Sequence, residues 1–143
     1  MEHLNCPDCR TCNIFASSLF YHHCDEINPA KTLLELKRGE QLFIEKTPAS
    51  YLFCVKQGRF LLSKGQHSIV PRLVDIANPG SLLGVESLVH KNQYFNSSTA
   101  LENALVCRID VSEFILQSHL SPTIMANATK YIARQIDNLE ALR

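Results

Sequence analysis

The sequence predicts a mainly β fold with flanking helices, and three observations support this prediction. Short apolar segments recur between residues 31 and 110, and turns with Gly or Pro separate them. After residue 110 the apolar spacing changes to steps of three and four residues, which indicates helices. The chain has 143 residues, 45% of them hydrophobic and 20% charged, which suits one domain with a buried core.

The β region is expected to form a compact antiparallel barrel or roll. Turn sequences with glycine, such as residues 37–40, 56–58 and 78–80, mark the ends of its short strands. The expected strands cover residues 33–36, 41–45, 51–56, 59–63, 73–77, 82–83 and 104–109.

Three helices are expected outside this region. The apolar positions of residues 14–24 indicate a short amphipathic helix. Asp110 can cap a helix over residues 111–118, and Glu113 can complete a capping box. Ser121 and Pro122 then suit the cap and the first position of a longer helix.

The longer helix, residues 122–143, carries an apolar stripe that has two interpretations. One is pairing with the same helix of a second copy, which would make the protein a homodimer. The other is packing of the stripe on the chain's own β roll. We favour pairing, because the helical pattern continues to Arg143 without a stop signal. The stripe consists of Met125, Ala128, Ile132, Ile136 and Leu139.

The composition argues against several classes of protein. Lys plus Arg and Asp plus Glu number 14 each, so no basic excess points to nucleic acid. No apolar run approaches the roughly 20 residues of a transmembrane helix, and the N-terminus lacks the features of a signal peptide. We therefore expect a cytoplasmic protein, in which the six cysteines bind metal or undergo redox chemistry. No catalytic motif is recognisable, so we do not expect an enzyme.

The most specific motif is the C-x2-C-x2-C run of Cys6, Cys9 and Cys12. This spacing lets one short loop direct several thiolates toward one point, as in iron–sulfur and zinc sites. A fourth ligand has to come from elsewhere in the chain. The remaining cysteines are Cys24, Cys54 and Cys107.

The later cysteines have structural alternatives to ligation. Cys107 shares a strand face with Leu105 and Ile109, so a plain core cysteine is one interpretation. Cys54 lies in the middle of a strand and is expected in the core. Cys24, or a neighbouring histidine, could complete a tetrahedral zinc site with the three early cysteines.

Several segments of the chain resemble the CRP/FNR regulators, which also have a β roll, a short helix and a long pairing helix in this order. Residues 36–43 and 52–59 resemble two hairpins of the family, and residues 78–84 resemble the glycine-bearing turn before its effector pocket. Residues 100–109 closely resemble the closing strand of FNR, the iron–sulfur oxygen sensor. The resemblance implies a cyclic-nucleotide-binding-like double-stranded β-helix, or jelly roll, followed by a long dimerisation helix.

In the FNR branch, three N-terminal cysteines and one cysteine on the closing strand hold a [4Fe–4S] cluster. The resemblance therefore implies Cys6, Cys9, Cys12 and Cys107 as the ligands in this chain. FNR has a wider gap before its third N-terminal ligand, which makes Cys24 an alternative to Cys12.

Two features of the family are missing. Members that bind cyclic nucleotides have a Glu after the pocket glycine and an Arg for the cyclic phosphate, but here Val85 follows Gly84 and residues 94–99 contain no Arg. Glu86 would repel a phosphate if it faced inward, so we do not expect cAMP as the effector. The helix-turn-helix domain is also absent, so DNA contact is expected only through a domain outside this chain.

These inferences divide the chain into a cysteine-rich segment with a short helix, 1–24, a β-roll sensor domain, 25–121, and a dimerisation helix, 122–143. The main hypothesis is the sensor domain of a CRP/FNR-like transcription regulator, which responds to oxygen, nitric oxide or redox state through the cluster and thereby controls dimerisation. One alternative is a zinc-stapled or metal-free β-roll module that binds a small ligand or a protein. Another is a plain cyclic-nucleotide-like domain with incidental thiols.

Overall fold

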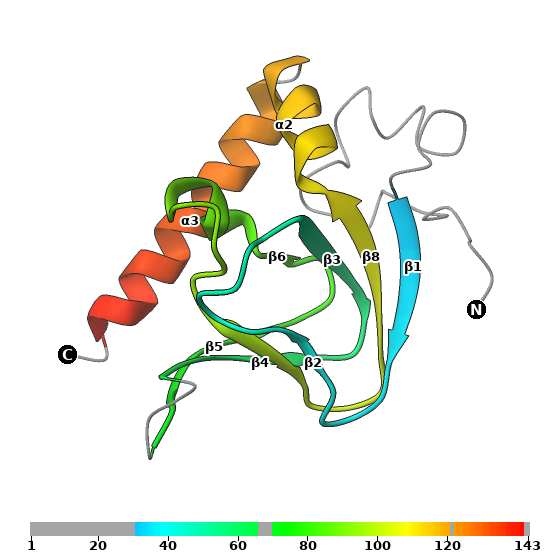
Figure 1. Cartoon of the computed structure of the whole chain (residues 1–143), viewed down its shortest axis with the longest axis vertical. Coiled ribbons are helices and arrows are strands. Elements are labelled where there is room, and N and C mark those ends of the chain that lie inside the picture. The colour runs from blue at the N-terminus through cyan, green and yellow to red at the C-terminus, as the bar shows by residue number, and fades with distance from the viewer. Residues whose placement is uncertain (1–30, 66–69, 121, 142–143) are drawn as a thin grey trace.

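The computed structural model describes residues 31–65, 70–120 and 122–141, which form a β roll followed by two helices (Figure 1). The predicted cysteine segment and its short helix, residues 1–24, lie outside these ranges, and so do Cys6, Cys9, Cys12 and Cys24. The strands are β1 (Lys31–Leu36), β2 (Gln41–Phe43), β3 (Tyr51–Gln57), β4 (Phe60–Lys64), β5 (Arg72–Ala77), β6 (Leu82–Leu83), β7 (Ser97–Ala100) and β8 (Ala104–Asp110). The helices are the 3-10 helix η2 (Val85–Val89), α2 (Val111–Leu120) and α3 (Pro122–Ala141).

Two four-stranded antiparallel sheets build the roll. Sheet A has the order β1-β8-β3-β6, and sheet B has the order β2-β7-β4-β5. The predicted strands correspond to β1 to β6 and β8, which confirms the mainly β jelly-roll fold. Strand β7 and helix η2 were not predicted, because β7 has small polar residues in place of an apolar alternation.

Sheet A buries both of its faces, because alternate side chains along each strand point in opposite directions. On one side, the side chains of sheet A meet those of sheet B, and the residues of both sheets together with Tyr94 fill the roll interior: Leu36, Phe43, Phe53, Val55, Phe60, Leu62, Val74, Ala77, Leu83, Tyr94, Ala100, Ala104 and Val106. On the other side, the side chains of sheet A meet residues of the helices, and we call the buried residues of both the helix-side cluster: Leu33, Leu52, Cys54, Leu82, Val85, Cys107, Ile109, Phe114 and Ala128.

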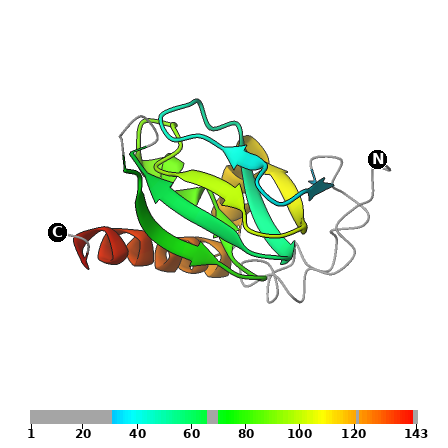
Figure 2. The ribbon, with the colours of Figure 1, turned by 90° about the horizontal axis from the view of Figure 1, so that it is seen from below.

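Helix α3 lies along one side of the roll and contacts η2 and β5 (Figures 1 and 2). Its Ala128 is 3% exposed and its Ile132 packs against the helix-side cluster, whereas Met125 is 46% exposed. Part of the predicted stripe therefore packs on the chain's own roll, and pairing through residues 122–143 stays a prediction. No helix in the described ranges has the length and apolar character that a membrane span requires.

Candidate functional site

Cys107 is the predicted ligand that falls within the described residues. It lies on β8 inside sheet A, with Leu33 of β1 opposite it on one side and Cys54 of β3 on the other. Its side chain is 1% exposed and shares the helix-side face with Leu105 and Ile109, as the strand alternation predicts. A core cysteine and a sheltered ligand would both be buried here, so ligation by Cys107 stays a prediction.

Two helices cover the face of sheet A that carries Cys107. Phe114 of α2 is 1% exposed and Ala128 of α3 is 3% exposed, and both belong to the same buried cluster as Cys107. Ile132 of α3 packs against this cluster from outside. Since protein interiors are close-packed, a new covalent or metal bond at the Cys107 sulfur would alter the packing of the side chains directly beneath α2 and α3.

Ligation of a cofactor by Cys107 together with cysteines of the N-terminal segment stays a prediction. The chain enters sheet A through β1, and Leu33, the third residue of that strand, is already opposite Cys107. Soft thiolates are the ligands of iron–sulfur clusters and of structural zinc. Within the described ranges no three His, Cys, Asp or Glu side chains gather closely enough to hold a metal ion. The predicted ligands Cys6, Cys9 and Cys12 lie outside these ranges.

A polar group of side chains lies at the end of the roll next to η2. Glu86 of η2 is 5% exposed, and its Oε2 atom has no hydrogen-bond partner among the described residues. Burial raises the pKa of Glu86 to about 7, while its own backbone N–H and the charge of Lys64 act in the opposite direction. The Lys64 ammonium lies 3.7 Å from Glu45 Oε2 and donates to the Phe95 carbonyl. Two carboxyl groups thus already accompany this cation, which makes an added anion unfavourable.

An aromatic ring fills the space beside the glycine turn that precedes η2. Gly84 has a φ of +91°, and a Cβ added there would lie 3.1 Å from Cε1 of Tyr94. The Tyr94 ring stacks on Phe43 with 4.2 Å between centroids, and its hydroxyl donates to the Tyr51 carbonyl over 2.7 Å. Val85 points the other way, into the helix-side cluster. A stacked tyrosine therefore occupies the position beside the turn, where the resemblance would place a phosphate and its arginine.

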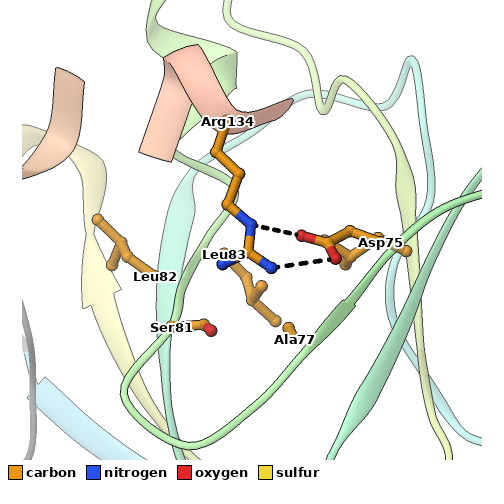
Figure 3. A pocket seen from close by; sticks show the side chains of 7 residues that line it. Asp75, Ala77, Ser81, Leu82, Leu83 and Arg134 are labelled. Atoms are coloured by element: carbon orange, nitrogen blue, oxygen red, sulfur yellow. Dashed lines mark hydrogen bonds and ion pairs between the residues drawn. The ribbon is translucent and has the colours of Figure 1, made fainter. Parts of the chain in front are cut away.

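A second link joins α3 to sheet B (Figure 3). Arg134 Nε lies 3.0 Å from Asp75 Oδ2, and Arg134 Nη2 lies 3.2 Å from Asp75 Oδ1. The small hollow beneath this pair has room for about one water molecule and no larger ligand. Two hollows of about 390 Å³ open elsewhere on the described part of the surface, and neither is lined by Cys107, Glu86 or Gly84.

Sequence reasoning missed three features of this region. It placed Cys54 in the core, but the pairing of Cys54 with Cys107 depends on the register of β3 and β8, which a single sequence does not reveal. The stacking of Tyr94 against the glycine turn also depends on a tertiary contact. The ion pair between Asp75 and Arg134 joins residues 59 positions apart, and no local pattern marks it.

Comparisons with known proteins agree with this architecture. A solved structure from Geobacter metallireducens, a candidate cyclic nucleotide-binding protein, shares 21% identity with a TM-score of 0.71, over 89% of this chain and 94% of that one. The catabolite activator protein of Thermus thermophilus shares 18% identity with a TM-score of 0.67, over 78% of this chain and 53% of that one. The heme domain of CooA from Carboxydothermus hydrogenoformans shares 15% identity with a TM-score of 0.63, over 79% of this chain and 78% of that one. The chain therefore spans about half the length of the Thermus protein.

Comparison of the sequence with protein families agrees with the structural comparison. No match was found among curated proteins. Residues 33–116, more than half of the chain, match the cyclic nucleotide-binding domain, and they contain both sheets from Leu33 onward, η2 and the first part of α2. The chain belongs to the cyclic nucleotide-binding domain family.

Proposed function

We propose that this chain is the sensor domain of a CRP/FNR-like transcription regulator and that it responds to oxygen, nitric oxide or redox state. In this proposal Cys6, Cys9, Cys12 and Cys107 hold a [4Fe–4S] cluster, with Cys24 as the alternative to Cys12. When bound, the cluster would supply a centre that oxidants attack. DNA binding would belong to a domain outside these 143 residues.

One observation carries the proposal. Cys107 lies in the same buried cluster as Phe114 of α2 and Ala128 of α3, on the outer face of sheet A. A regulator needs its sensing residue to be coupled to the element that changes partners, and here a single layer of packed side chains joins the two. The CooA structure is named as a heme domain, which gives a precedent for a metal cofactor in this fold.

The mechanism rests on what the chain's own residues do. Ligation by Cys107 would fix the N-terminal thiolates against β8, beside the entry of β1 into sheet A. Release of Cys107 would leave a small, uncharged thiol in an apolar cluster and would remove the segment held against it. The packing of Ala128 and Ile132 would then change, and with it the face that α3 offers to a second copy.

The same reasoning argues against a cyclic nucleotide as the effector. Tyr94 fills the space beside Gly84, and Glu86 and Glu45 both lie near the partly buried Lys64. A cyclic phosphate at this position would meet negative charge and no guanidinium partner. Titration of the protein with cAMP, followed by calorimetry, should therefore give no saturable heat. A saturable heat would favour the plain cyclic-nucleotide-like domain.

Anaerobic purification followed by iron, sulfide and zinc assays tests the proposal directly. We expect a coloured protein with about four iron and four sulfide per chain, which bleaches in air. Cys107→Ser should lose most of this iron, and Cys54→Ser, a matched change at an equally buried thiol, should keep it. A colourless protein with about one zinc would favour the zinc-stapled binding module, and a protein without metal would exclude both.

A further inference from the structure

The pairing of β3 with β8 brings two thiols together on one face. Cys54 and Cys107 are directly opposite in the register, and both side chains belong to the helix-side cluster. The Val111 amide donates a hydrogen bond of 3.0 Å to the Ser50 carbonyl, which identifies Ser50 and Val111 as a hydrogen-bonded pair of this ladder. In an antiparallel ladder every second pair of opposite residues is hydrogen-bonded, so Cys54 and Cys107, four residues along each strand from Ser50 and Val111, form a hydrogen-bonded pair. The Cα atoms of such a pair are about 5.5 Å apart. This separation lies within the range of about 4.4 to 6.8 Å that disulfides span.

We propose that Cys54 and Cys107 form a reversible disulfide when the protein meets a small hydroperoxide, which makes this cross-strand pair a redox site. Directly opposite Cβ atoms in a ladder are about 4.5 to 5.5 Å apart, somewhat more than the usual disulfide spacing of about 3.8 Å. The strands would have to approach slightly to close the bond. Since strained disulfides are reduced more easily, a low-molecular-weight thiol should reopen it.

The surroundings of the pair select the oxidant. Both side chains are 1% exposed, and Phe114 of α2 and Ala128 of α3 complete the same cluster. Hydrogen peroxide is small enough to enter such a layer during its fluctuations, whereas a peptide disulfide is not. The rate of oxidation should therefore depend on how tightly α2 and α3 are packed.

The reaction balances with one peroxide per pair. The Cys107 sulfur attacks one oxygen of the peroxide and the O–O bond breaks, while the thiol proton passes to the departing oxygen, which yields a Cys107 sulfenic acid and water. The Cys54 sulfur then attacks the Cys107 sulfur, forms the S–S bond and releases a second water. The two thiols together lose two electrons and two protons, and the peroxide O–O bond is reduced. A thiol directly opposite would also stop Cys107 from advancing to the sulfinic acid, which is rarely reversible.

The regulatory meaning of this step rests on the proposed function. If Cys107 is a cluster ligand, a disulfide to Cys54 removes that ligand until it is reduced. An oxidant would then act in two ways: it would destroy the cluster, and the disulfide would prevent the cluster from forming again until it is reduced.

The test uses the full chain without metal, treated anaerobically with hydrogen peroxide and then digested for mass spectrometry. We expect a linked peptide pair that joins Cys54 to Cys107, two hydrogens lighter than the separate peptides and reversed by dithiothreitol. Cys54→Ala should lack the link and accumulate sulfinic acid at Cys107. Phe114→Ala should form the link faster. Cys54 and Cys107 left reduced after treatment, or Cys107 linked to an N-terminal cysteine instead, would overturn the inference.

A separate assay distinguishes this inference from the proposed function. The iron and sulfide content of the untreated, anaerobically purified protein tests the cluster alone. A protein with a full cluster but no linked peptide in its metal-free form would refute the disulfide and leave the proposed function intact. A protein with the linked peptide but no iron would support the thiol pair and refute the cluster.

Discussion

The two faces of sheet A contact different parts of the molecule. The inward face belongs to the roll interior, where Phe60 and Val106 are 0% exposed and no helix intervenes. The outward face belongs to the helix-side cluster, where Cys107 shares its packing with α2 and α3. The interior holds the two sheets together, whereas the outer cluster joins the sheet to the elements that could change partners.

The two faces also differ in the chemistry of their side chains. In the roll interior, Tyr94 occupies the space beside the glycine turn, and Glu86 of η2 is buried with one carboxyl oxygen that has no hydrogen-bond partner among the described residues. On the outer face, the sulfur atoms of Cys54 and Cys107 are the polar atoms in an otherwise apolar cluster. The two facing thiols are therefore on the helix side of sheet A.

The largest expected effects come from removing one aromatic ring on each side of the sheet. Phe60→Ala in the roll interior and Phe114→Ala in the helix-side cluster should each lower the free energy of unfolding by about 3 to 5 kcal/mol, because both rings are almost completely buried. Urea denaturation measures this loss. Hydrogen exchange should separate the two variants, since only Phe114→Ala should speed the exchange of α3 amides. Equal exchange of α3 in both variants would contradict the division into two clusters.

The next effect concerns the buried carboxyl group in the roll. The folded protein holds the Glu86 proton up to about pH 7, whereas the unfolded chain releases it near the ordinary value of 4.5. Between these values the folded state binds more protons, so raising the pH lowers the free energy of unfolding, and the loss is complete above about pH 7. Glu86→Gln should remove this dependence and raise the stability at pH 8 by about 3 kcal/mol.

A carboxyl group on the surface provides the control for this pH measurement. Glu35 is exposed on β1, and Glu35→Gln makes the same carboxyl-to-amide change at the surface. Chemical denaturation at a series of pH values gives both curves. If the free energy of unfolding of Glu86→Gln had the same pH dependence as that of the wild type, ionised Glu86 would not destabilise the folded state at neutral pH.

A smaller effect is expected where α3 meets the sheet. Ala128 is 3% exposed against the helix-side cluster, so Ala128→Leu should overpack it and cost about 1 to 3 kcal/mol. Ala126 is an exposed position on the same helix, and Ala126→Leu should change the stability by less than about 0.5 kcal/mol. Thermal unfolding of the two variants side by side checks the difference, and equal stability would mean that α3 does not dock as described.

The smallest effect concerns the ion pair that ties α3 to sheet B. The Arg134 side chain is 56% exposed and that of Asp75 is 18% exposed, so water and salt screen the pair. A double-mutant cycle with Asp75→Ala and Arg134→Ala should give a coupling energy of about 0.5 to 1 kcal/mol that shrinks at high salt. A coupling well above this value would make the pair a main anchor of α3.

Local patterns in the sequence were enough to predict most of the fold. The apolar segments with glycine turns predicted every strand except β7, and the cap and proline at residues 121–122 predicted the start of α3. Strand β7 was missed because Ser97 and Ser98 are buried by their neighbours in sheet B and not by any apolar character of their own. Helix η2 has only five residues, too few for a periodic pattern.

The candidate site was only partly predictable, for a physical reason. The alternation along β8 correctly placed Cys107 on a buried face with Leu105 and Ile109. Whether that face meets the other sheet or the helices is decided by tertiary packing, and the pairing with Cys54 is decided by the register. The ligand set that includes Cys6, Cys9 and Cys12 stays a prediction.

We propose that ligation at Cys107 controls the association of the chain through α3. Sedimentation velocity under anaerobic conditions should compare iron–sulfur-loaded protein with metal-free protein, and the same pair of preparations of the Cys107→Ser variant. We expect a larger dimer fraction for loaded wild-type protein, and monomer for both metal-free protein and the variant. The same monomer–dimer constant for loaded and metal-free wild-type protein would contradict it.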